Sequence, residues 1–307
     1  MNELTPAPPA ETPQTAQAAP SAGDLAGRQG FDEQFLGLPL PIPELPDVDT
    51  ILLPYTHFSV LLRPDKRLAA VTALGIDGAR LFDLDRSGIN WRLDPRVPAD
   101  QQTGEAVYAR NDIDRGHLVR RASAVWGSSE AEAAQANRDT FYYTNSAPQA
   151  ADFNQGMELW LGLESYLLDH ATDYRRRLVV FTGTIFSDKD PVYRGVQIPL
   201  RFFKVAAFIQ DGALAATAYI VDQTPQLAEL PDVPSPGARE EAPPLGPFRT
   251  FQVPVRDVAA LTGLDLAQLE AADRMPAASA LPTARVATTW RLLSAPEDLD
   301  LDFDLER

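Results

Sequence analysis

The chain reads AVYARNDIDRGHLVR at residues 106–120, FYYTN at 141–145 and NQGMELWLGLESYLLDHATD at 154–173. The first two stretches contain the β-branched and aromatic residues that are typical of strands. The third has leucines at 159, 163 and 167 and begins with an asparagine suited to a helix N-terminus, so it predicts a helix. The order strand, strand, helix forms the centre of the expected fold, with Asp-Arg-Gly-His at 114–117 on its first strand.

Further strand patterns surround this centre. HFSVLL (57–62) and RLAAVTALGI (67–76) are separated by the turn-forming RPDK, which predicts a β-hairpin. Three more strand-like runs follow, namely RLVVFTGTIF (177–186), FFKVAAFI (202–209) and TAYIVDQ (217–223). Residues 254–271 indicate one or two short helices.

The two ends of the chain differ in composition from the middle. Residues 1–29 are dominated by Ala, Pro, Thr and Gln without apolar periodicity, which predicts a disordered tail. Residues 297–307 form an acidic tail, and 30–296 are predicted to form a single domain. Within that domain, residues 31–54 mix apolar residues with repeated proline, which favours extended chain packed around the outside.

Composition excludes several kinds of site. The chain has no cysteine, so disulfides, zinc–thiolate centres and thiol nucleophiles are ruled out. It has three histidines, and His57 and His170 lack motif neighbours, so we expect them to be structural or exposed. No apolar run reaches the roughly 18 to 20 residues of a membrane-spanning helix, and no signal-peptide pattern opens the chain. A cytoplasmic protein without membrane contact is expected, with specialised export left open.

The net charge of −16 argues against a nucleic-acid enzyme, because binding to a polyanion is driven by Lys and Arg. The charge is uneven, however. Residues 1–50 hold eight acids and one base, residues 297–307 hold six acids and one base, and the 246 residues between them carry only −4. Four arginines fall within twelve positions of that middle part: Arg110, Arg115, Arg120 and Arg121. A basic patch that faces phosphate is therefore compatible with the composition.

The motif set resembles the DNA/RNA non-specific endonucleases, the ββα-metal nucleases that include mitochondrial endonuclease G. The resemblance is carried by DRGH at 114–117, TNSAPQ at 144–149, FNQ at 153–155 and WLGLE at 160–164. It extends more diffusely from about Gly30 to about Asp273. It implies an α+β fold with a ββα-metal (His-Me finger) core and a central, mostly antiparallel sheet flanked by helices.

The resemblance also implies roles for three residues of the central unit. His117 would be the general base that takes a proton from the attacking water, a task suited to an imidazole. Asn154 would bind one Mg²⁺, or Mn²⁺, through its side-chain oxygen, and Glu164 would hold the water molecules around that ion. Family members have eight positions from this Asn to this Glu, whereas the chain has ten, so we expect a local insertion at residues 156–157.

Four further residues receive roles from the resemblance. Arg115 would contact the phosphate, and Arg67 matches a second phosphate-binding arginine in a looser context. Asn145 would join the polar network near the metal, and Asp114 would orient its neighbours. Each proposed site residue also has a plainer interpretation: a strand histidine for His117, a helix cap for Asn154 and a solvated acid for Glu164.

The predicted function is a metal-dependent endonuclease that hydrolyses phosphodiester bonds of DNA and RNA with little sequence specificity. The alternatives are a non-catalytic nucleic-acid-binding or interaction protein on the same scaffold, and a nuclease effector toxin delivered into other cells. DNA and RNA are the expected partners, and a homodimer or an inhibitory or activating protein partner is left open. The acidic tail at 297–307 is hypothesised to compete with nucleic acid for a basic groove.

Overall fold

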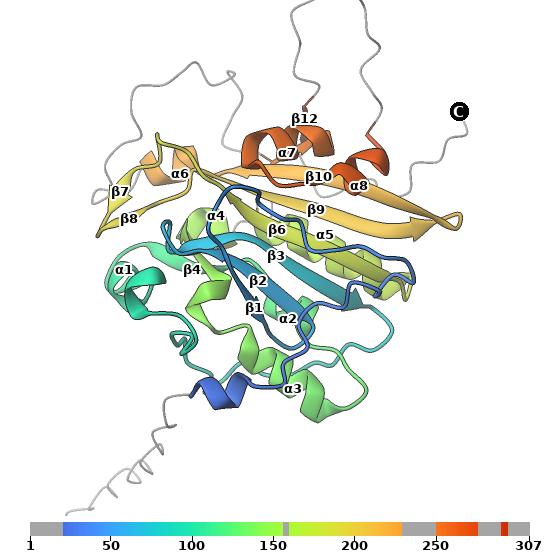
Figure 1. Cartoon of the computed structure of the whole chain (residues 1–307), viewed down its shortest axis with the longest axis horizontal. Coiled ribbons are helices and arrows are strands. Elements are labelled where there is room, and N and C mark those ends of the chain that lie inside the picture. Colours follow the sequence, from blue (N-terminus) through green and yellow to red (C-terminus); the bar gives the residue numbers. More distant parts are fainter. Residues whose placement is uncertain (1–20, 156–159, 229–249, 276–289, 294–307) are drawn as a thin grey trace, which may run out of the picture.

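A computed structural model describes residues 21–155, 160–228, 250–275 and 290–293 of the chain (Figure 1). Within these residues, one sheet has eight strands in the order β1-β2-β3-β6-β9-β10-β11-β12, and every neighbouring pair is antiparallel. The strands are β1 (Ile51–Pro54), β2 (Phe58–Arg63), β3 (Leu68–Asp77), β6 (Arg177–Ile185), β9 (Arg201–Gln210), β10 (Ala213–Asp222), β11 (Thr250–Val253) and β12 (Arg291–Leu293). The predicted hairpin is confirmed as β2 and β3, and the three later runs are β6, β9 and β10.

The central strands are buried on both faces. Every residue of β3 is buried, and its side chains alternate: Val71 and Ala73 enter one apolar cluster, Leu74 and Ile76 the other. A sheet of this kind needs cover on each side. Burial of each large apolar side chain stabilises the fold by about 1.5–3 kcal/mol.

Helices supply that cover. On the face of Leu74, helix α5 (Trp160–Asp173) contributes Trp160, Leu163 and Leu167 to the core. On the other face, α7 (Val255–Thr262) and α8 (Ala267–Ala271) contribute Val255, Val258 and Leu269 (Figure 1). These two short helices confirm the prediction for residues 254–271.

A second, two-stranded sheet carries the central motif. It pairs β4 (Ile113–His117) with β5 (Ser146–Ala150), and α4 (Ala151–Gln155) and α5 follow. The predicted strand at 141–145 is wrong, since residues 143–145 form a 3₁₀ turn, η3 (Tyr143–Asn145), and the strand begins one residue later. The helix predicted at 154–173 is two helices, and Asn154 lies inside the first. The insertion expected at 156–157 falls outside the described residues.

The remaining elements are short. They are η1 (Ala22–Leu25), η2 (Ala99–Gln101), α1 (Glu105–Tyr108), α2 (Arg121–Ala124), α3 (Glu130–Asp139), β7 (Val192–Tyr193), β8 (Val196–Gln197) and α6 (Thr224–Ala228). Helix α3 begins after Ser129, whose hydroxyl accepts the backbone N–H of Glu132. In Figure 1, α2 and α3 lie on the side of the sheet opposite α7.

Part of the segment predicted as a disordered tail is ordered. Leu25 of η1 is buried in the core, and Arg28 forms an ion pair with Asp139 at 2.8 Å. Residues 21–29 therefore pack against the domain, because one apolar side chain and one buried ion pair anchor them. The extended segment that follows buries Phe31, Phe35 and Leu40, as its composition predicts. The acidic tail at 297–307 lies outside the described residues.

Among the helices in the described part of the chain, none combines the length and apolarity needed to cross a membrane.

Candidate active site

The Asp-Arg-Gly-His motif lies on β4, where the ladder pairs Asp114 with Gln149 and His117 with Ser146. Because strand side chains alternate, Arg115 and His117 share one face of β4, while Asp114 points to the other. Two groups of polar side chains therefore lie along this strand, one around His117 and Arg115 and one around Asp114.

Gly116 is required by close packing. A Cβ atom at this position would lie 1.9 Å from Oε1 of Gln149 and 2.7 Å from its Cγ. Gln149 is fully buried, and neither polar atom of its amide has a hydrogen-bond partner within the described residues. Gln149 was not predicted to have a role of its own, although a glycine inside a strand signals such a close approach.

The imidazole of His117 lies among aromatic rings. Its centroid is 4.6 Å from that of Trp91 and 5.1 Å from that of Phe141, which it meets edge-on. Its Nε2 is buried without a partner among the described residues. Burial, helped by the positive charges of Arg121 and Arg86, lowers the pKa of His117 to about 3. The ring is therefore neutral at neutral pH, the form that accepts a proton.

Arg115 is fixed in place by an acid from α1. Its Nη2 donates to Oε2 of Glu105 at 2.5 Å, and the hydroxyl of Tyr143 donates to the same oxygen at 2.5 Å. These two hydrogen bonds lower the pKa of Glu105. The guanidinium carbon of Arg115 also lies over the ring of Tyr108, 5.3 Å from its centroid.

Arg67 belongs to the same neighbourhood through a different contact. It lies in the turn between β2 and β3 with φ of 60°, and its Nη2 donates to the carbonyl of Gln102 at 3.1 Å. Its own carbonyl accepts the N–H and hydroxyl of Thr103. These bonds tie Arg67 to the segment that leads into Glu105, rather than to His117 itself.

Asp114 organises the other side of β4. Its Oδ2 accepts the amide nitrogens of Asn154 at 2.9 Å and Gln155 at 2.8 Å. The amide nitrogen of Asn154 therefore points at Asp114, which leaves the amide oxygen as the atom that could meet a cation.

The donor set at Asn154 suits a hard cation. Across the described residues, no three or more His, Cys, Asp or Glu side chains are grouped so that they could hold a metal ion. An ion at Asn154 would therefore be held by the amide oxygen with few charged ligands, and water and substrate would fill the other positions. Mg²⁺ fits such a site, because it prefers oxygen ligands and keeps several of its waters.

Asn145 is fully buried and bonded to backbone. Its Oδ1 accepts the N–H of Val119 at 2.9 Å, and its Nδ2 donates to the carbonyls of Val119 at 3.1 Å and Thr140 at 3.0 Å. Its own carbonyl accepts the N–H of Leu118. These bonds commit Asn145 to holding the chain that directly follows His117.

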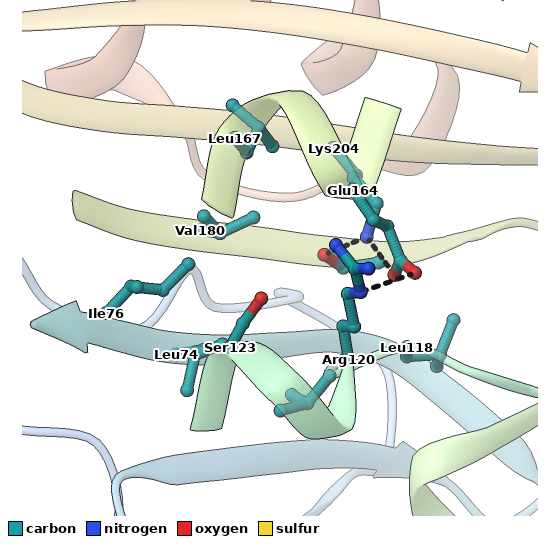
Figure 2. Close-up of a pocket in the computed structure, with 11 residues that line it drawn as sticks. Leu74, Ile76, Leu118, Arg120, Ser123, Glu164, Leu167, Val180 and Lys204 are labelled. Carbon is teal, nitrogen blue, oxygen red and sulfur yellow. Dashed lines mark hydrogen bonds and ion pairs between the residues drawn. The ribbon is translucent and has the colours of Figure 1, made fainter. Parts of the chain in front are cut away.

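Glu164 is buried in a charged cluster rather than solvated (Figure 2). Its Oε1 lies 3.1 Å from Nζ of Lys204, and its Oε2 lies 3.9 Å from Nε of Arg120. The three side chains line a small pocket whose other walls are mostly apolar. Burial raises the pKa of Glu164, although both neighbouring cations oppose this, and burial lowers the pKa of Lys204.

Lys204 connects this cluster to the backbone of His117. Its Nζ lies 4.0 Å from the ring centroid of Trp160, and the indole N–H of Trp160 donates to the carbonyl of His117 at 3.3 Å. Lys204 was not predicted as a site residue, although a lysine inside the apolar run FFKVAAFI is a signal, since lysine is rarely buried without a partner.

A sequence model of the DNA/RNA non-specific endonuclease family matches residues 42–273. The chain belongs to this family. The chain is 38% identical over 266 residues to the uncharacterized protein y4fB of Sinorhizobium fredii (strain NBRC 101917 / NGR234), an alignment that covers 78% of this chain and 39% of that protein. It is 28% identical over 195 residues to human mitochondrial endonuclease G, covering 59% of this chain and 57% of the human protein.

A solved structure has the same fold as this chain. The crystal structure of an EndoG/EndoGI complex, described as the mechanism of EndoG inhibition, matches with a TM-score of 0.56 at 18% identity. The match covers 82% of this chain and 94% of the solved chain. The expected ββα-metal fold with a large antiparallel sheet is thereby confirmed. The chain spans only 39% and 57% of the lengths of the two curated relatives above.

Proposed function

We propose that this chain is a divalent-metal-dependent endonuclease that hydrolyses phosphodiester bonds in DNA and RNA with little sequence preference. The observation that carries the proposal is His117, whose buried ring is neutral and whose Nε2 has no partner in the described part of the chain. It lies on one strand face with Arg115, a cation suited to phosphate. Membership of the non-specific endonuclease family supports the same reaction.

In this proposal His117 accepts the proton of the water that attacks phosphorus. Arg115, held by Glu105, contacts the phosphate and offsets its charge, and Arg67 supports that region through the segment at residues 102–103. Contacts to the phosphate carry no sequence information, so a site built on them accepts DNA and RNA of any sequence.

Asn154 would hold a Mg²⁺ or Mn²⁺ ion through its oxygen, oriented by Asp114. When bound, such an ion stabilises charge on the phosphate and the departing oxygen. Glu164 would accept hydrogen bonds from water around the ion through Oε2, because Oε1 is occupied by Lys204. Asn145 would act by holding the backbone that follows His117.

Removal of the Asn154 oxygen tests the metal part of the proposal. Asn154→Ala is expected to raise the Mg²⁺ concentration for half-maximal cleavage of supercoiled plasmid by about 10- to 100-fold. Gln155→Ala is the matched control, since Gln155 also donates to Asp114 but is given no ion to bind. Equal Mg²⁺ requirements for Asn154→Ala and wild type would show that Asn154 is not a metal ligand.

The low pKa of His117 predicts an unusual pH profile. A general base works only while neutral, so kcat/KM falls as pH drops through the pKa of the free enzyme. For His117 that value is about 3, so kcat/KM for plasmid is expected to stay level as pH falls from roughly 8 to roughly 5. An acidic limb with a midpoint near the ordinary histidine value of about 6.5 would contradict the buried, neutral ring.

A further inference from the structure

We propose that Arg86 and Arg121 form a second phosphate-binding subsite beside His117, which holds the nucleic-acid backbone next to the phosphate being cut. The inference rests on the proposed function and extends it, since neither arginine has a role in the reaction described above. Arg86 lies in the loop after β3, and Arg121 is the first residue of α2, which comes after β4.

The two segments are docked together. Arg121 is four residues beyond His117, and its Nη1 donates to the carbonyl of Leu84 at 2.6 Å. Two more bonds hold the same loop, from the amide of Asn137 to the carbonyl of Asp85 and from the N–H of Phe82 to the carbonyl of Val125. A loop fixed at three points presents Arg86, which is exposed, in a defined place.

Neither arginine has an acidic partner within 4.0 Å in the part of the chain that the structure describes. Several other arginines of the fold are paired with a carboxylate, among them Arg28 with Asp139, Arg63 with Asp65, Arg80 with Asp77, Arg96 with Asp94 and Arg115 with Glu105. The nearby carboxylate of Asp85 instead accepts the N–H and hydroxyl of Ser87.

The guanidinium of Arg121 keeps most of its hydrogen-bonding capacity. An arginine has five N–H donors, and the bond to Leu84 uses one. If Arg121 only anchored the loop, that role would explain its bond to Leu84. It would not explain why a partly buried Arg121 lies next to a second cation, Arg86. A phosphate oxygen provides the acceptors and the negative charge that the pair lacks.

The electrostatics agree with this geometry. Burial and the charge of Arg86 both lower the pKa of Arg121, while Asp83 and Asp85 face it and partly offset this. The charges of Arg121 and Arg86 also reach His117, where they disfavour protonation of the ring. The side of the pair that faces His117 is therefore positive, as a subsite for a polyanion requires.

Salt dependence of binding tests the subsite. The binding measurement uses a His117→Ala background without divalent cation, so that the DNA is bound but not cut. Affinity for a short duplex DNA is measured by fluorescence anisotropy between about 50 and 200 mM KCl. The slope of log K against log salt is negative, and each lost phosphate contact makes it shallower by about 0.9. Arg86→Ala and Arg121→Ala are each expected to make it shallower by about that amount, and the double variant by about twice as much. Arg256→Ala, on α7 at the opposite face, is the matched control and should leave the slope unchanged.

The outcomes separate the subsite from the proposed function, because cleavage of the same duplex is measured in parallel with protein that retains His117. If the arginine variants have shallower salt slopes but the protein that retains His117 does not cleave DNA, the subsite is supported and the nuclease proposal is wrong. If the protein that retains His117 cleaves DNA but the double variant has an unchanged salt slope, the subsite alone is overturned. Absence of any DNA binding at about 50 mM KCl would also overturn the subsite. Arg86→Ala guards against misfolding, since Arg86 is exposed.

Discussion

Replacement of His117 by alanine is expected to lower the rate of phosphodiester hydrolysis by about 10²- to 10⁴-fold, the usual contribution of a general base. The ring is held neutral by burial and by the cations near it, and alanine leaves no group that could take the proton. The measurement is single-turnover cleavage of a defined duplex with saturating Mg²⁺. Metal and phosphate contacts remain in the variant, so binding of the duplex should change little.

The matched control removes a different imidazole. His57 stacks on Trp126 at 3.7 Å between centroids and bonds to Glu132 at 3.0 Å, so His57→Gln is expected to reduce stability while keeping the rate of the folded protein. If His117→Ala cut as fast as wild type, another group would have to be the base, and the proposed role of His117 would be wrong.

Replacement of Lys204 by methionine is expected to destabilise the fold by about 3–5 kcal/mol, the cost of leaving a buried charge without its partner. Only 3% of the Lys204 side chain and 7% of the Glu164 side chain are exposed, so the carboxylate loses its nearest cation in a place that bulk water barely reaches, and Arg120 at 3.9 Å is too far away to replace that contact. Methionine keeps the length and the apolar part of lysine, which separates the loss of charge from the loss of volume. Urea unfolding near neutral pH measures the difference.

A double variant tests the cause of that loss. Adding Glu164→Gln to Lys204→Met removes the stranded charge, so the pair of changes is expected to cost less than Lys204→Met alone. Lys66→Met serves as the surface control, since Lys66 is only partly buried and bonds to the neutral side chain of Gln197. Equal losses for the single and double variants would indicate that packing, rather than the ion pair, makes Lys204 important.

Local sequence patterns predicted the sheet well. The hairpin of β2 and β3 followed from two strand-like apolar runs and the turn at RPDK, and α7 and α8 followed from helical spacing. The placement of His117 on a strand followed from the motif that contains it. Such signals lie within a few residues of each other, which is why sequence alone carries them.

The aromatic segment at 141–145 shows where propensity fails. Its composition favours a strand, but Asn145 bonds to the backbone of Val119 and Thr140, and the backbone of Tyr142 accepts the N–H of Asn145. These tertiary bonds tighten the segment into a 3₁₀ turn. Because Val119 lies 26 residues away, no local pattern reports this contact.

The surroundings of Glu164 were hidden for the same reason. From the sequence, Glu164 could be a solvated helix acid or a residue near the metal, but in the structure it is buried against Lys204, which is 40 residues further along the chain. That pairing depends on α5 packing over the strand that carries Lys204. The composition of a single helix cannot predict it.

The net charge was also a poor guide to the site. The formal charge of −16 is concentrated near the two ends, whereas the surroundings of His117 carry Arg115, Arg120, Arg121 and Arg86. Since phosphate binding depends on the local field, an acidic protein can still present a positive site.

The central claim is tested most directly by a time course of the purified chain on supercoiled plasmid and on total RNA, with Mg²⁺, with Mn²⁺ and with a chelator. A metal-dependent, non-specific nuclease degrades both substrates in the presence of metal and neither in the chelator. Intact plasmid and RNA under every ion, from protein that is folded, would contradict the account.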